Sequence, residues 1–165
     1  MRHKSGFTLV EVLIAIILVG LAIASLVGAN ISFTRANGVG ADLSTAEFLI
    51  EQFRELSTLL SVIDPNSVID PNTGMDYFGS EEAVLADYDD LDDFDGKSFS
   101  PPINANREVL NNFEAFSQQI TVENVNGANF ENTVADHGSD FVRVTVRVFL
   151  NNREISSNSW IRALY

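Results

Sequence analysis

One long apolar segment near the N-terminus constrains the fold of this chain more than any other feature of its sequence. Residues 7–29, 23 in all, are apolar almost throughout. As a helix, a segment of this length rises about 35 Å, whereas the hydrocarbon core of a bilayer is about 30 Å thick. The sequence therefore predicts a helix that can span a membrane.

Glu11 places a carboxylate inside this apolar segment, close to its start. An acidic side chain at the middle of a membrane helix costs about 2.5–3.5 kcal/mol. The simplest explanation is that the helix starts at the membrane surface and the carboxylate reaches water. The other explanation requires a cation that meets Glu11 within an apolar environment, because an unpaired buried charge is costly.

The residues around the start of the segment resemble a known family. Arg2, His3 and Lys4 precede it, an arrangement that retains a short N-terminus in the cytoplasm. Residues 4–15, which read Lys-Ser-Gly-Phe-Thr-Leu-Val-Glu-Val-Leu-Ile-Ala, resemble the N-terminus of type IV prepilins and type II secretion pseudopilins. That resemblance implies cleavage between Gly6 and Phe7 by a membrane prepilin peptidase, followed by methylation of the new N-terminus.

The same resemblance gives Glu11 a role in assembly, since it corresponds to the glutamate at the fifth mature position. The freed amine of Phe7 would be largely cationic at neutral pH. A Glu11 carboxylate from an adjacent subunit would pair with it and fix the axial register of the two helices. The implied partners are other pilin or pseudopilin subunits, the peptidase, an inner-membrane assembly platform and membrane lipid. The implied location is the bacterial inner membrane, followed by a periplasmic or extracellular filament.

Two further interpretations of this segment stay open. A conventional signal peptide cut after Ala22-Ile23-Ala24 or Val27-Gly28-Ala29 would release a secreted enzyme. However, its apolar region would contain Glu11 and would exceed the usual length of about 7–15 residues. Alternatively, the chain is a monomeric membrane-anchored binding domain outside the cytoplasm that never polymerises.

Charge and cysteine content limit the partners of the rest of the chain. The formal charge is −13, and removal of residues 1–6 would leave 8 basic residues against 23 acidic ones, or −15. Such a surface repels nucleic acid, so we expect no nucleic-acid ligand for the globular part. The chain has no cysteine, which excludes disulfides and departs from many type IVa pilins. Pseudopilins often lack the disulfide, so this departure favours them or the minor pilins.

The pattern of apolar residues divides the chain into a leader (1–6), a membrane and assembly helix (7–29), an amphipathic continuation of that helix (30–60) and a globular domain (61–165). The continuation carries an apolar stripe at intervals of three or four, namely Ala46, Leu49, Phe53, Leu56 and Leu60, widened by Ile50 and Leu59. Asn37-Gly38-Val39-Gly40 predicts a bend or a locally melted segment, because glycine disfavours helix. Residues 61–66 and 67–72 form a tandem repeat whose Asp-Pro-Asn triplets predict turns.

An acidic loop follows at residues 76–96, with nine acidic residues and no basic one between 76 and 95. Clustered carboxylates suit Ca²⁺, which makes Asp90, Asp92, Asp93 and Asp95 candidate ligands, although the spacing does not fit an EF-hand. Residues 89–96 also resemble the Asp-Asp-x-Asp-Asp-x-x-Gly signature of minor pilins similar to those of mannose-sensitive haemagglutinin pili. The alternative is a solvated loop that only tucks Tyr88, Leu91 and Phe94 onto the domain.

The C-terminal part alternates in polarity as β-strands do. Strands are predicted at residues 116–125, 141–150 and 154–164, with a turn at Asn126-Gly127 and a hairpin turn at Asn151-Asn152. One apolar sheet face needs a cover, which the stripe of the helix provides. We therefore predict an α+β fold, with a long N-terminal helix packed on a small antiparallel sheet, as the pilin resemblance also implies.

No catalytic function is predicted. Residues 135–140 contain aspartate, histidine and serine, but residues this close on a polar loop do not form a triad, and the sequence has no G-x-S-x-G nucleophile elbow. The leading functional hypothesis is a structural subunit, a minor pilin or pseudopilin, of a type IV pilus or type II secretion pseudopilus.

Overall fold

The computed structural model describes residues 6–63 and 82–164. Residues 1–5 of the predicted leader, residues 64–72 of the tandem repeat and residues 76–81 of the acidic loop lie outside this range. Contacts between Cα atoms divide the chain into two compact units, residues 1–41 and residues 42–165. Helix α1 (Leu9–Leu59) contributes to both units, and each unit is considered by itself.

The first unit consists of the N-terminal part of α1. The helix runs without a break through Asn37–Gly40, so the locally melted segment predicted there is wrong. Two glycines cost about 1 kcal/mol each in a helix, but helix-forming residues on both sides continue the hydrogen-bond ladder. The boundary between the two units, after Ala41, nevertheless falls directly behind this segment.

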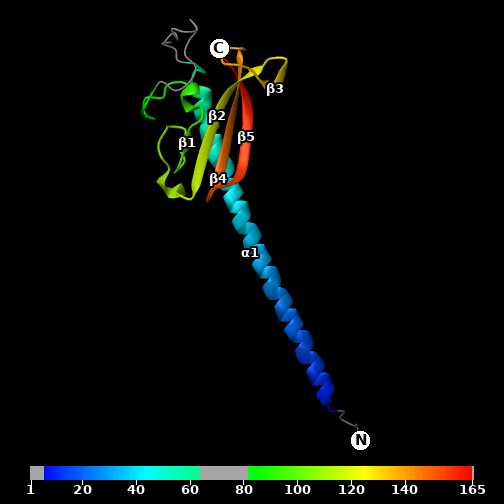
Figure 1. Cartoon of the computed structure of the whole chain (residues 1–165). Coiled ribbons are helices and arrows are strands. Elements are labelled where there is room, and N and C mark those ends of the chain that lie inside the picture. The colour runs from blue at the N-terminus through cyan, green and yellow to red at the C-terminus, as the bar shows by residue number, and fades with distance from the viewer. Residues whose placement is uncertain (1–5, 64–81, 165) are drawn as a thin grey trace. The chain divides into compact units, whose positions relative to one another are not determined.

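The second unit contains an antiparallel sheet with the strand order β1-β2-β4-β5, and β3 pairs with β2 (Figure 1). The strand bounds are β1 (Ser98–Phe99), β2 (Phe116–Asn126), β3 (Asn129–Thr133), β4 (Phe141–Leu150) and β5 (Arg153–Ala163). Two short 3₁₀ turns, η1 (Asp92–Phe94) and η2 (Asn111–Phe113), precede β1 and β2 respectively.

The turn between β4 and β5 has the chemistry that the sequence predicted. Asn151 and Asn152 have φ angles of 50° and 63°, and a two-residue hairpin turn of type I′ requires positive φ at both central residues. Asparagine tolerates this region better than other non-glycine residues. The predicted hairpin is therefore confirmed.

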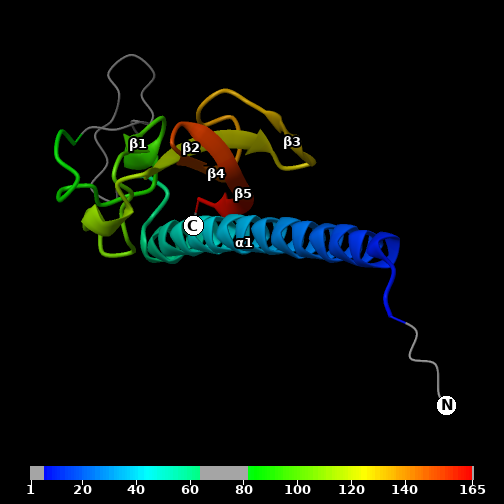
Figure 2. The same cartoon turned by 90° about the horizontal axis from the view of Figure 1, so that it is seen from below.

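The C-terminal part of α1, which belongs to the second unit, covers one face of this sheet, as Figure 2 shows from below. The core contains Ala46, Leu49, Ile50, Phe53 and Leu56 from α1, and Ile120, Val122, Val142, Val144, Val146 and Val148 from β2 and β4. Leu59 is 76% exposed, so its assignment to the apolar stripe was wrong. Leu59 is the last residue of α1, and its neighbour Leu60 is the one that packs against the core.

The α+β prediction is confirmed, with a long helix packed on an antiparallel sheet. The three predicted strands correspond to β2, β4 and β5. Sequence reasoning missed β1, which has only two residues, and β3, whose five residues are all exposed. Neither strand carries the alternating burial that reveals a strand in the sequence.

Candidate functional site

The first candidate site is the start of α1, where Thr8 and Glu11 form a reciprocal capping box. The Glu11 N–H donates to Thr8 Oγ1 (3.3 Å), while the Thr8 N–H and the Thr8 hydroxyl donate to Glu11 Oε2 (3.3 and 3.4 Å). This exchange satisfies two of the N–H groups that a helix leaves without partners at its start. Glu11 therefore has a function inside its own chain, which the sequence analysis missed.

A sequence signal for this cap was present, since Thr-x-x-Glu directly before an apolar run is the signature of a capping box. Glu11 also lies in the first turn of the helix, where a negative charge interacts favourably with the helix dipole. Gly6 and Phe7 precede the helix, and Phe7 is 85% exposed. The predicted cleavage point therefore lies on accessible, non-helical backbone.

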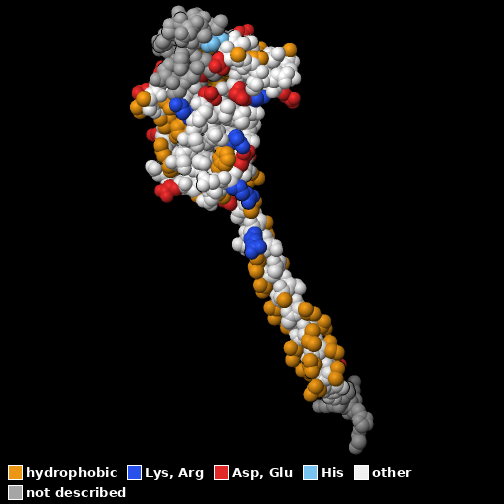
Figure 3. Space-filling view, in the orientation of Figure 1, with side chains coloured by type: hydrophobic (Ala, Val, Ile, Leu, Met, Phe, Trp, Pro, Cys, Tyr) orange, Lys and Arg blue, Asp and Glu red, His pale blue; other side chains and the backbone are white. Residues whose placement is uncertain are grey.

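The helix that follows exposes its apolar side chains. Every residue from 6 to 41 is exposed, and hydrophobic side chains cover much of the visible face of this unit (Figure 3). Among the described residues, α1 is the one helix that is long and apolar enough to cross a membrane. Exposed apolar surface of this extent marks contact with a membrane or with another protein.

The second candidate site is the acidic turn around η1. Tyr88, Leu91 and Phe94 are buried, as predicted, and Phe94 packs edge-on against Phe53 of α1 with ring centroids 5.2 Å apart. The neighbouring aspartates are not solvated, because Asp90, Asp92 and Asp93 are each 0% exposed. The solvated-loop alternative is therefore wrong for these three side chains.

Two of the aspartates accept hydrogen bonds from local backbone N–H groups. Asp90 Oδ1 accepts the N–H of Asp93 (3.1 Å), and Asp93 Oδ2 accepts the N–H of Asp89 (3.1 Å). The second oxygens, Asp90 Oδ2 and Asp93 Oδ1, are buried and have no hydrogen-bond partner among the described residues. Burial raises the pKa of Asp90 above its ordinary value of 3.8, with a smaller contribution from the neighbouring charges of Asp93 and Asp89.

The structure brings together a set of carboxylates that differs from the four predicted calcium ligands. One oxygen each from Glu82, Asp89 and Asp93 lie within 4.8 Å of one another. Of the predicted ligands, only Asp93 belongs to this group. Glu82 was missed because it lies seven residues before Asp89 in the sequence, and only the folded loop brings the two together.

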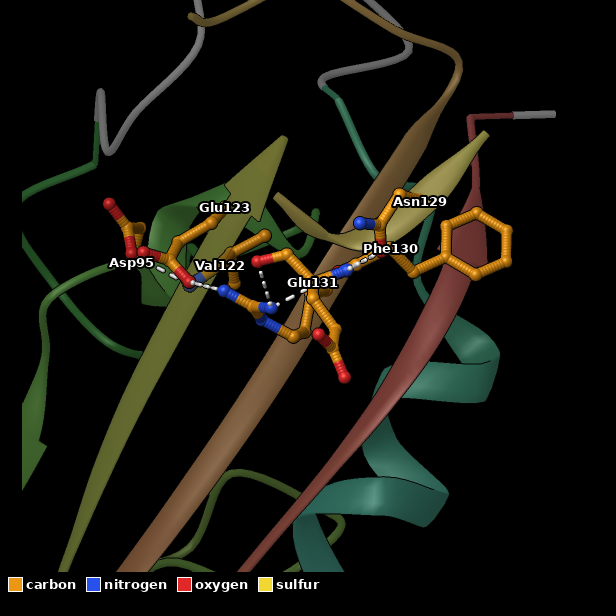
Figure 4. A network of polar contacts seen from close by, with 7 residues as sticks. Asp95, Val122, Glu123, Asn129, Phe130 and Glu131 are labelled. Atoms are coloured by element: carbon orange, nitrogen blue, oxygen red, sulfur yellow. Dashed lines mark hydrogen bonds and ion pairs between the residues drawn. The ribbon is translucent and has the colours of Figure 1, made fainter. Parts of the chain in front are cut away.

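Asp95, another predicted ligand, has a structural contact instead. Its Oδ1 accepts the N–H of Val122 in β2 at 2.7 Å (Figure 4). In the same network, Arg143 of β4 binds Glu123 Oε2 (2.8 Å) and the carbonyl oxygens of Phe130 (3.1 Å) and Glu131 (3.4 Å). These contacts connect the acidic turn and β3 to the central strands.

The loop at residues 135–140 carries no triad among its described contacts. The hydroxyl of Ser139 donates to the backbone carbonyl of Val125, and the His137 N–H donates to Asn124 Oδ1 (3.0 Å). These bonds anchor the loop to β2. Ser139 and His137 therefore hold the loop in place through these hydrogen bonds.

Comparison with known proteins gives one match. Residues 1–27 match the family described as "Prokaryotic N-terminal methylation motif". No curated protein and no solved structure matches the chain. Over this N-terminal segment, the match confirms the resemblance to type IV pilins and pseudopilins. The motif supports a pilin-type subunit, and it implies processing by prepilin peptidase and association with other such subunits. The motif and the apolar helix together fit membrane anchoring.

Proposed function

We propose that the chain is a minor subunit of a type IV pilus or of a type II secretion pseudopilus. In this proposal, prepilin peptidase cuts between Gly6 and Phe7 and methylates Phe7. The mature subunit is then anchored in the inner membrane, with its globular domain outside the cytoplasm, and an assembly platform adds it to a filament. The observation that carries the proposal is the methylation motif at the head of an apolar helical segment whose residues are exposed up to residue 41.

The position of Glu11 explains how assembly would follow cleavage. In the precursor its carboxylate caps the helix through Thr8. Cleavage would place the new ammonium group of Phe7 beside the positive end of the helix dipole, which is unfavourable. A carboxylate from an adjacent subunit would relieve that repulsion, and burial of the pair would fix the register of the two helices.

A minor subunit is favoured over a major one by two features outside the motif. The chain lacks the cysteines that close the C-terminal loop of many type IVa pilins. It also carries the Asp-Asp-x-Asp-Asp-x-x-Gly sequence at residues 89–96, which resembles a minor-pilin signature. Its binding partners would be other subunits, met through the exposed apolar helix.

The experiment separates the charge of Glu11 from its function as a helix cap. Glu11→Gln retains an oxygen that can accept the Thr8 N–H but removes the charge. Thr8→Val removes the hydroxyl from the capping box but leaves the charge of Glu11 in place. Both variants, in the full chain, are compared with wild type for membrane insertion, for the mass of the mature N-terminus and for incorporation into filaments.

We expect wild type and both variants to insert and to mature to an N-methylated Phe7. Incorporation should fall strongly for Glu11→Gln and change little for Thr8→Val, because a cap contributes only about 1 kcal/mol. Normal incorporation of Glu11→Gln would refute the charge pairing. A mature N-terminus beyond Leu9 would refute the processing, and an uncut chain that forms no filaments would favour the monomeric anchored binding domain.

A further inference from the structure

We propose that Glu82, Asp89 and Asp93 form a Ca²⁺ site at the base of the acidic turn. The three side chains come from separate points of the loop, and one carboxylate oxygen of each lies within 4.8 Å of the others. Two oxygens bound to one Ca²⁺ at 2.3–2.6 Å are at most about 5 Å apart. The spacing therefore allows a single ion to contact all three carboxylates.

Asp93 supplies an independent reason for a ligand at this position. Its side chain is fully buried, and its Oδ1 has no hydrogen-bond partner among the described residues. A buried polar atom without a partner costs about 1–3 kcal/mol, and more if it is charged. A cation in contact with this carboxylate would remove that cost.

Within the described part of the chain, Asp90 and Asp93 form no ion pair with a basic side chain. The basic side chains of this region make other contacts, since Lys97 Nζ lies over the Tyr88 ring (5.4 Å to its centroid) and Arg107 donates to the Tyr88 carbonyl. Burying several carboxylates without a counter-charge costs several kcal/mol for each.

The three side chains differ in their exposure to solvent, so an ion can reach the site from one side. Asp93 is buried, Glu82 is half-buried and Asp89 is exposed. Asp93 would thus form the floor of the site and Asp89 its rim, where water can complete the coordination. Ca²⁺ takes six to eight oxygens in flexible geometry, whereas Mg²⁺ demands near-ideal octahedral geometry at 2.0–2.1 Å, so this mixed set of carboxylates and water favours Ca²⁺.

The bound ion would stabilise the fold directly. Asp93 lies in η1 next to Phe94, whose ring contacts Phe53 of α1 and Tyr88. Neutralising the carboxylates would therefore hold the acidic turn against the helix and the sheet. This site is independent of the proposed function in filament assembly, so a failure of either leaves the other intact.

The test measures the melting temperature of the full chain in detergent, at constant ionic strength, in CaCl₂, MgCl₂ or EGTA. A ligand bound only by the native state raises this temperature, and at about 100 times the dissociation constant the expected rise is on the order of 10 °C. Asp93→Asn should abolish the rise. Asp87→Asn, which removes an exposed carboxylate of the same loop outside the group, should retain it.

Asp89→Asn guards against a folding defect in the Asp93 variant, because Asp89 is exposed and its substitution disturbs no core packing. This variant should fold as wild type does in EGTA and lose most of the response to Ca²⁺. No rise for wild type at millimolar Ca²⁺ would overturn the proposal. An equal rise in wild type and in both Asp89→Asn and Asp93→Asn would overturn it as well.

Discussion

Gln118 connects the helix of the second unit to the sheet through a fully buried amide. Its Nε2 donates to the carbonyl oxygen of Leu49 in α1, and its Oε1 accepts the N–H of Ile103, both at 2.8 Å. The side chain points to the same face of β2 as Ile120 and Val122. One polar group in the core thus joins three segments that are far apart in the sequence.

The perturbation that tests this connection is Gln118→Met, which keeps the length of the side chain and removes both hydrogen bonds. The buried N–H of Ile103 would lose its acceptor, at a cost of about 1–3 kcal/mol. The carbonyl of Leu49 lies within a helix and keeps its helical partner, so its loss is about 0.5–1.5 kcal/mol. Together these give a loss in the free energy of unfolding of about 1.5–4.5 kcal/mol.

The matched control is Gln119→Met, the same substitution one residue later and on the opposite, half-buried face of β2. We expect a change within about 0.5 kcal/mol for this control. Thermal unfolding of the full chain in detergent, followed by circular dichroism, should show a fall of about 5–15 °C for Gln118→Met. Equal melting temperatures for the two variants would refute the reasoning, because burial and bonding are what distinguish the two positions.

Two further predictions concern the network of Figure 4. Arg143→Met should speed amide hydrogen exchange in β3. It should lower the global free energy of unfolding by only about 1 kcal/mol, because Glu123 is 40% exposed and solvent screens the ion pair. Unchanged exchange in β3 would contradict this prediction. Asp95→Ala should lower the melting temperature, because it leaves the N–H of Val122 without its acceptor at a cost of about 1–3 kcal/mol. Asp95→Asn keeps an acceptor oxygen and should be close to wild type in chemical denaturation, whereas equal losses would show that the charge matters instead.

The sequence predicted most of the fold because the periodicity of its main elements is strong. Val142, Val144, Val146 and Val148 alternate with polar residues in β4, and all four are buried. The strand β3 was not predicted, because all five of its residues are exposed and it has no buried apolar face. It is held by Arg143, whose bonds run to backbone carbonyls, and such contacts leave no pattern in the sequence.

The acidic turn was harder to predict, because a run of aspartates in the sequence does not show which of their side chains are buried in the fold. The acidic composition of the loop indicates that Asp92 and Asp93 are solvated. However, both are buried, and Leu91 and Phe94 on either side of them lie in the core. The group of Glu82, Asp89 and Asp93 depends on the path of the loop. The start of α1 lies within one local stretch of sequence, so the sequence analysis could interpret its motif and its charge together, although it missed the cap that Glu11 forms with Thr8.

The arrangement of burial along α1 explains how one helix can serve two purposes. Its buried residues lie between Ala46 and Ser57, within the second unit, whereas residues 6–41 are all exposed. The core of the globular unit therefore draws on only the last turns of the helix. The exposed apolar segment before it supplies no buried residue to that core, so under the proposed function its side chains would be available first to lipid and later to neighbouring subunits. Substitutions such as Glu11→Gln can consequently alter assembly while the globular unit keeps its stability.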